Sequence, residues 1–177
     1  MRKILLPAFC FLATTVFSQT NNITVNMNGI SDFKIGMKKQ EIEKLIAKTI
    51  TLKNLNKEDW MMDTFKCQYK GAEFTLIFDR DYIDDNNFNI ILYEVNSNST
   101  LLKTPGGISI GDDKIKIVTT YDGYTIYLMP EWENDYTVKS KTRSLVMVHG
   151  DESGHVITFH MNNNKVESMS VSVEEGD

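Results

Sequence analysis

The sequence predicts an α+β protein of two tandem repeats, each a short helix packed on an antiparallel β-meander. The first observation is a strand–turn–helix pattern that occurs twice, at residues 33–46 and again at residues 106–121. In each copy an apolar alternation ends at a glycine, Gly36 or Gly111, and an amphipathic segment follows. The second observation is the alternation of apolar and polar residues after each predicted helix, which is typical of strands with one buried face.

The first repeat is predicted to span residues 30–96 and to begin with a short helix. Ile42, Leu45 and Ile46 recur at the spacing of one helix face, and charged residues occupy the opposite face. Gly36 either lets the backbone leave the preceding strand at a dihedral angle open to few other residues, or lets it approach the helix start closely. The sequence leaves both roles open, for this glycine and for its counterpart in the second repeat.

A β-hairpin is the clearest element of the first repeat. Apolar residues alternate on both sides of Lys70-Gly71, a pair that predicts a two-residue turn. This turn places Cys67 opposite Phe74, so the apolar side chains of both strands share one face. A third strand is expected over residues 88–95, which gives the order helix, hairpin, strand.

The second repeat, residues 106–175, follows a polar linker at residues 97–105 and has the same order of elements. A helix is expected from about Asp112 to Tyr121, with Asp112 placed to cap it. The strands expected after it lie at residues 124–129, 145–149, 155–161 and 166–173. Because these strands are adjacent in sequence, antiparallel sheets with a helix on one face are predicted.

The N-terminal residues have the plan of a secretory signal peptide. Arg2 and Lys3 precede an apolar run, so residues 1–18 are the predicted signal, and the mature chain is expected to be secreted, into the periplasm. The apolar run is shorter than the ~20 residues of a stable membrane span. Cys10 fits a lipidation site poorly, because it follows the bulky Phe9 inside the run.

The composition of the mature chain excludes some classes of partner. Loss of the signal removes two basic residues and no acidic one, which changes the formal net charge from −5 to −7. An acidic chain without a basic cluster argues against nucleic acid and against an anionic membrane surface as partners. Cys67 is the single cysteine left, so packing must stabilise the fold without an internal disulfide. Residues 19–29 are a polar lead-in, and no cofactor is expected.

Two short motifs resemble a known family pattern. Ile35-Gly36-Met37 before the first helix and Ile108-Ser109-Ile110-Gly111 before the second resemble the entry motif of the SmpA/OmlA (BamE) outer-membrane lipoproteins. The tandem order of a helical segment and a meander resembles the β-lactamase inhibitory protein and the BLIP-like secreted proteins that share its fold. The resemblance covers most of the mature chain. It implies a protein that binds other proteins across a concave sheet surface and has no catalytic activity.

Histidines gather near the last predicted hairpin, which makes a metal-dependent hydrolase the first alternative. If residues 150–154 close this hairpin, His149 and His155 lie opposite each other with Asp151 in the loop between them. Two imidazoles and a carboxylate can bind zinc. A loop with two histidines supplies few ligands, however, and no supporting shell is evident. The prediction is therefore no metal, with both histidines ending a core row of Leu145, Met147, Ile157 and Phe159.

Two further segments resemble catalytic motifs but have structural explanations. Cys67 lies in the middle of a predicted strand among aromatic residues, where a thiol is normally inert. Gly107-Ile108-Ser109-Ile110-Gly111 nearly matches the Gly-x-Ser-x-Gly nucleophile elbow, but Ser109 is a strand residue and Gly111 makes the turn. No catalytic residue is predicted.

Large apolar side chains in polar surroundings are the candidate partner-binding residues. Trp60 and Met62 follow the first helix, and Trp132 and Tyr136 occupy the corresponding place in the second repeat. Each of these side chains is either an anchor for a partner or a lid over the edge of the core.

The last hairpin supplies a second set of candidates. Val146, Val148 and His160 are expected on the face opposite the core row, where they would contact a partner or the other repeat. The expected function is that of a secreted, non-catalytic protein that binds another protein or a cell-envelope component through its sheet face and aromatic loops. The alternatives are the metal-dependent hydrolase and a structural envelope subunit without a discrete site.

Overall fold

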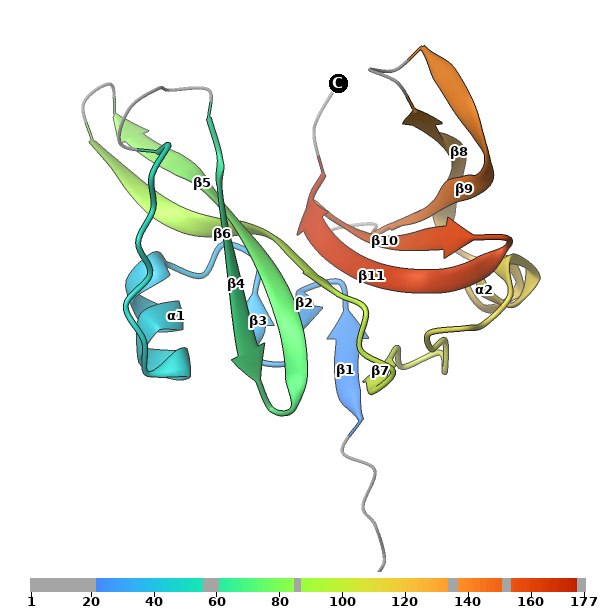
Figure 1. The fold of residues 1–177 in the computed structure, drawn as a ribbon, viewed down its shortest axis with the longest axis horizontal. Coiled ribbons are helices and arrows are strands. Elements are labelled where there is room, and N and C mark those ends of the chain that lie inside the picture. Colours follow the sequence, from blue (N-terminus) through green and yellow to red (C-terminus); the bar gives the residue numbers. More distant parts are fainter. Residues whose placement is uncertain (1–21, 56–60, 85–86, 134–136, 151–153, 175–177) are drawn as a thin grey trace, which may run out of the picture.

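The structure is a computed structural model that describes residues 22–55, 61–84, 87–133, 137–150 and 154–174. Of the described residues, 59% lie in strands and 11% in helices. The strands form one sheet of seven strands, the large sheet, and one of four strands, the small sheet. The predicted α+β class with a helix on each meander is therefore wrong, and the protein is mostly β (Figure 1).

The helices are correctly located but contribute little to the fold. α1 (Lys39–Ile46) has eight residues and buries Ile42, while α2 (Lys114–Thr120) has seven and buries Ile117. The prediction overestimated the share of the fold that the helices form. Helical spacing indicates that a helix exists but does not show how much of the core the helix supplies. Within the described residues, neither helix is long and apolar enough to cross a bilayer.

The large sheet is antiparallel throughout and contains strands of both repeats. Its order is β4 (Asp63–Tyr69), β5 (Ala72–Asp84), β6 (Asn87–Ser97), β11 (Lys165–Val173), β10 (His155–Asn162), β9 (Val138–His149) and β8 (Thr125–Glu133). The repeats join where β6 pairs with β11, with Val95 opposite Val171. In the first hairpin Cys67 pairs with Phe74, which confirms the predicted register.

The small sheet was not predicted, although its strand at Phe33–Lys34 lies in the strand expected before the first helix. Its order is β3 (Phe33–Lys34), β2 (Gly29–Ile30), β1 (Ile23–Asn26) and β7 (Leu102–Lys103). β1 comes from the predicted lead-in and pairs in parallel with β7 from the predicted linker. Strands of two to four residues are too short to show an alternation in the sequence, so only their pairing reveals them.

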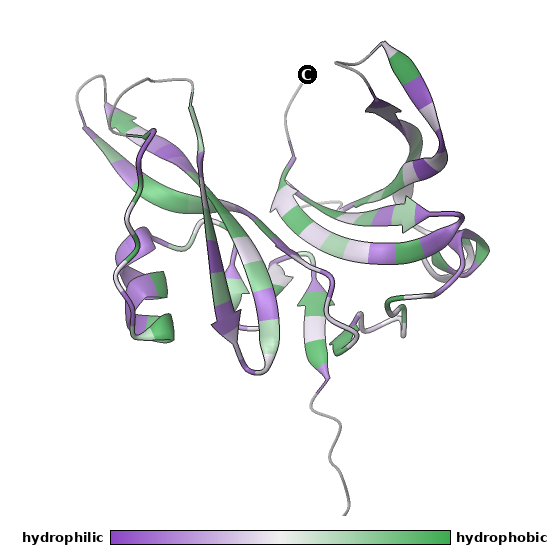
Figure 2. Ribbon diagram, in the orientation of Figure 1, coloured by the Kyte–Doolittle hydropathy of each residue, from purple (hydrophilic) through white to green (hydrophobic). Residues whose placement is uncertain are grey.

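The core lies between the large sheet and a layer formed by the small sheet and the helices. In Figure 1 these elements lie below the large sheet, whose two ends turn upward. Phe33 of β3 packs edge-on against Phe74 of β5, with ring centroids 5.0 Å apart. Figure 2 shows apolar and polar residues alternating along the strands of the large sheet, as expected for a sheet with one buried face.

The first glycine turn ties the start of its repeat to the last strand of the same repeat. Gly36 has a φ angle of +79°. Its N–H donates to the Leu92 carbonyl of β6 at 2.9 Å, and the Leu92 N–H donates to the Met37 carbonyl at 2.9 Å. A Cβ atom at Gly36 would meet nothing within 4 Å, so the glycine is needed for its dihedral angle and not for a close approach.

The second glycine turn repeats these contacts. Gly111 has a φ angle of +87° and open space around the Cβ position. Its N–H donates to the Val166 carbonyl of β11 at 2.8 Å, and the Val166 N–H donates to the Asp112 carbonyl at 2.9 Å. Of the two roles that the sequence left open for both glycines, the structure shows the dihedral one, and the two turns are equivalent joints.

Asp112 does not cap α2 as predicted. The residue at the N-cap is Asp113, which makes no side-chain capping bond. The Asp112 carboxylate instead accepts hydrogen bonds from the Ser109 N–H and from Lys116 Nζ, both at 2.7 Å. The aspartate therefore braces the turn before the helix.

We predict that Gly36→Ala and Gly111→Ala each lower the free energy of unfolding by about 1–3 kcal/mol, because alanine is strained at these φ angles. Urea denaturation followed by circular dichroism measures the change. Gly123→Ala is the matched control, because its φ is not positive and its Cβ position is also open. If both variants are as stable as the control, the positive φ angles of Gly36 and Gly111 do not require glycine.

Candidate functional site

The face of the large sheet opposite the core is the candidate site, and we call it the open face. The pairing register places one residue of every strand in a single row across it. In sheet order this row is Lys66, Thr75, Asn96, Ser170, Thr158, Met147 and Tyr127. The next row along the strands points into the core and is apolar throughout: Phe65, Leu76, Val95, Val171, Ile157, Val148 and Ile126.

The last hairpin has a different register from the prediction. His149 pairs with Val156 and not with His155, a difference of one residue. Since neighbouring residues of a strand point to opposite faces, this slip exchanges the two faces of β9. Val146 and Val148 are consequently fully buried in the core instead of lying on a partner surface. Met147, expected in the core, lies on the open face.

Two long hairpins border the open face and carry exposed aromatic side chains. At the β5–β6 hairpin Tyr82 and Phe88 pack edge to face, with ring centroids 5.9 Å apart. Both have the strand parity of the buried Phe78 and Leu92, so they lie on the side of the hairpin away from the open face. At the β8–β9 hairpin Trp132 is 44% exposed, and Lys139 Nζ lies 5.3 Å from the centre of its ring. Figure 1 shows these hairpins rising at opposite ends of the large sheet.

The outcome for the remaining aromatic and methionine candidates is mixed. Met62 lies just before β4 and is 38% exposed. Trp60 and Tyr136 lie outside the described residues. Tyr82 and Phe88 were missed, although an aromatic residue on each side of an Asp/Asn-rich loop was a usable signal.

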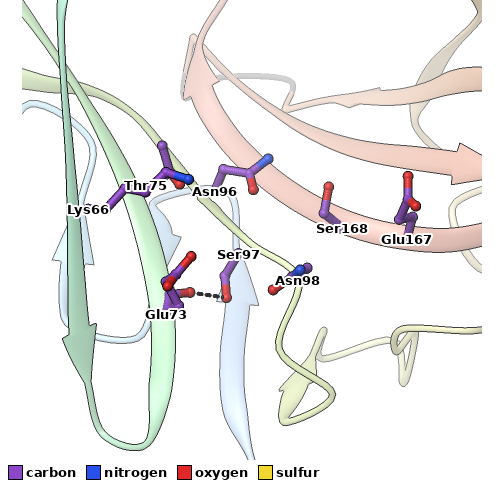
Figure 3. A pocket seen from close by; sticks show the side chains of 8 residues that line it. All are labelled: Lys66, Glu73, Thr75, Asn96, Ser97, Asn98, Glu167 and Ser168. Atoms are coloured by element: carbon purple, nitrogen blue, oxygen red, sulfur yellow. Dashed lines mark hydrogen bonds between the residues drawn. The ribbon is translucent and has the colours of Figure 1, made fainter.

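A polar pocket of about 250 Å³ lies where β6 and β11 diverge. Figure 3 shows side chains from both halves of the large sheet around it. The lining residues are Lys66, Glu73, Thr75, Asn96, Ser97, Asn98, Glu167 and Ser168. Ser97 is oriented by donating its hydroxyl to the Glu73 carbonyl at 2.6 Å. Amide, hydroxyl and charged groups at one place can hydrogen-bond to polar side chains of a partner.

A chain of polar groups crosses the floor of the open face. Glu94 accepts a hydrogen bond from Ser170, and burial nevertheless raises the pKa of Glu94 above its usual value. On the other side, Ser170 Oγ lies 3.2 Å from Nε2 of His160. Burial lowers the pKa of His160, against the opposing effect of Glu131, whose carboxylate lies 3.7 Å from Nδ1. This series of polar side chains thus links β6, β11, β10 and β8.

The order serine, histidine, glutamate resembles a nucleophilic triad, but the geometry does not support catalysis. Ser170 is only 3% exposed and lies in mid-strand, paired with Asn96 on one side and Thr158 on the other. The backbone around Ser170 is thereby committed to the sheet, whereas a nucleophile needs free N–H donors beside it. These hydrogen-bonded side chains stabilise the floor of the open face instead.

Cys67 and Ser109 also have structural roles. The Cys67 thiol is partly buried, and burial raises its pKa, which disfavours the reactive thiolate. Ser109 forms a β-bridge with Lys103, so it is an extended residue and not the apex of a nucleophile elbow.

The histidines proposed as metal ligands lie on opposite faces of their hairpin. His149 Nδ1 lies 2.5 Å from Glu174 Oε1, and the ring of Tyr127 packs against its imidazole. His155 Nδ1 lies 3.0 Å from the carbonyl of Met27, beside the small sheet. Asp151 lies outside the described residues, and within the described ranges no cluster of three or more histidine, cysteine or acidic side chains could hold a metal ion.

Comparison with known proteins leaves the function to be argued from the open face. No family model, curated protein or solved structure matches this chain. The resemblance to the BLIP-like and SmpA/OmlA proteins therefore rests on the two short motifs and the tandem order of elements alone.

We predict that Glu94→Gln changes the free energy of unfolding more favourably at pH 7 than at pH 4. The folded-state pKa of Glu94 is raised above the unfolded value, so its favourable contribution is present at low pH and is lost as the pH rises through the folded pKa. Glutamine keeps an acceptor for Ser170 without titrating. Urea denaturation at both pH values measures the difference.

Glu43→Gln provides a control of opposite sign. A hydrogen bond from Lys39 lowers the pKa of Glu43, so this variant should lose stability at pH 7 relative to pH 4. Equal effects of Glu94→Gln at both pH values would show that its carboxyl titrates normally.

Proposed function

We propose that the mature protein is a secreted, periplasmic, non-catalytic protein that binds another protein or a cell-envelope component across the open face. The observation that carries this proposal is the row from Lys66 to Tyr127, which crosses every strand of the large sheet between two hairpins with exposed aromatic side chains. Ser170 and Thr158 at its centre are buried, so a partner would contact the two ends of the row. A surface of this kind suits recognition by shape and hydrogen bonding.

The sheet supplies a rigid platform for a partner. Each strand between the two edge strands is paired on both sides, which holds the side chains of the row at set spacings. A surface that is already ordered loses little conformational entropy when it binds. Binding energy can therefore come from a few anchors.

The anchors and the polar groups divide the open face into two regions. At the β8 and β9 end, Met147 and Tyr127 offer apolar area. At the other end, Thr75 and Asn96 line the polar pocket. A matching partner would present apolar side chains to the first region and hydrogen-bonding groups to the second.

Charge favours a partner with basic side chains. Glu73 and Glu167 are exposed at the polar pocket, and Arg143 pairs with Glu167 at 3.2 Å. The whole chain has a formal net charge of −5. Complementary charge would speed the encounter with a basic surface and would make binding sensitive to salt.

We predict that Trp132→Ala and Tyr127→Ala each weaken binding by about tenfold or more, because exposed aromatic side chains act as hot spots. Photo-crosslinking from the open face of the mature chain identifies the partner, and calorimetry then measures the affinities. Circular dichroism verifies that each variant keeps its fold.

Lys103→Ala is the control, since Lys103 is exposed on β7 of the small sheet, away from the open face. It should leave the intrinsic affinity unchanged. If both aromatic variants bind the identified partner as the wild type does, the open face is not the binding surface.

A further inference from the structure

The two edge strands of the large sheet carry different side chains. β4 forms one edge, and Thr64, Lys66 and Gln68 on its open face are exposed and polar. β8 forms the other edge, where Tyr127 is 53% exposed and Leu128 is 55% exposed, on opposite faces. A lysine on an edge strand discourages further pairing, whereas an uncharged apolar edge invites another strand.

The exposed apolar side chains extend from β8 onto α2. We call this set the β8 edge patch, and it consists of Ile115, Val118, Tyr124, Tyr127, Leu128 and Met129. Lys114 at the start of α2 and Leu128 of β8 line one pocket of about 270 Å³, which joins the helix to the strand. Several exposed apolar side chains around one edge strand favour an interaction site there.

The part of β8 that can accept a strand is short. The pairing register of β8 shifts between Pro130 and Trp132, and proline has no N–H to donate. Pairing is therefore confined to residues 125–129. This segment, Thr-Ile-Tyr-Leu-Met, contains no charged residue.

We propose that β8 pairs antiparallel with β8 of a second copy of this chain, so that two large sheets join edge to edge about a two-fold axis. A two-fold axis brings the same segment of both copies together. With the axis near Tyr127, Ile126 of one copy meets Leu128 of the other, so apolar side chains face apolar side chains. Glu131 of each copy then lies beyond the paired segment, at opposite ends.

Charge favours a second copy at this edge over a charged partner. Copies of an acidic chain repel each other over most of their surface. The uncharged segment 125–129 is a place where two copies meet without opposed carboxylates, and it has no charged group to select a basic or acidic partner. A contact between two copies of the same segment needs no charged group on either side.

Edge pairing has a consequence for binding. It leaves both open faces free and places them side by side on the same side of one continuous sheet. A dimer would bind a partner with repeated sites more tightly than one copy does, without any new contact. The dimer itself does not depend on the proposed function, because it forms through the backbone of the β8 edge and needs no partner on the open face.

Sedimentation equilibrium of the mature chain from about 10 µM to about 1 mM tests the proposal, since a small interface gives a weak dimer. The wild type should show a monomer–dimer equilibrium in this range. Leu128→Lys should weaken association at least about tenfold by placing a charge on the edge. Thr64→Lys makes the same change on β4 and should associate as the wild type does.

Crosslinking keeps the proposal testable if Leu128→Lys disturbs the fold. In a Cys67→Ser background, Tyr127→Cys should form a disulfide-linked dimer under mild oxidation, while Gln68→Cys on β4 should not. A wild type that stays monomeric up to about 1 mM overturns the proposal. Equal association of Leu128→Lys and the wild type, or equal crosslinking from β4, also overturns it. Partner binding by a monomeric Leu128→Lys variant would separate this outcome from the proposed function.

Discussion

The two glycine joints are the constraint on which the rest of the fold depends. The two helices are short and each contributes a single fully buried side chain, so their packing alone does little to fix their position. The joints solve this problem with backbone hydrogen bonds, from Gly36 to Leu92 and from Gly111 to Val166. Each bond ties the beginning of a repeat to its last strand, β6 or β11. Those two strands then pair with each other, so the joints also bring the two halves of the large sheet together.

The large sheet divides its side chains by parity, and that division creates the open face. The core row is apolar in all seven strands, and it is covered by the small sheet and the helices. The neighbouring row carries Lys66, Thr75 and Asn96 at one end and Met147 and Tyr127 at the other. A sheet with one solvated face is ordinary for antiparallel strands. What distinguishes this one is the pair of aromatic hairpins at its borders and the change from polar to apolar along the row.

Electrostatics shape the open face and the β8 edge in opposite ways. On the open face, Glu94 and His160 are titratable groups held by Ser170 in surroundings that disfavour their charged forms. This arrangement costs stability at neutral pH through Glu94 and at acidic pH through His160, and it keeps polar groups in set positions. Along the β8 edge, residues 125–129 carry no charge at all. The acidic chain thus offers a polar surface for a partner and an uncharged edge for its own copy.

The sequence by itself determined the features that depend on neighbours in the chain. The register of Cys67 with Phe74 follows from a two-residue turn, and the alternation that ends at Gly36 and Gly111 marks a strand-to-helix turn at each glycine. Only the tertiary structure decided the features that depend on distant segments. The parallel pairing of β1 with β7 and the pairing of β6 with β11 leave no local pattern. The burial of Val148 depended on a register shift of one residue, and a strand of alternating apolar residues fits either face until its partner is known.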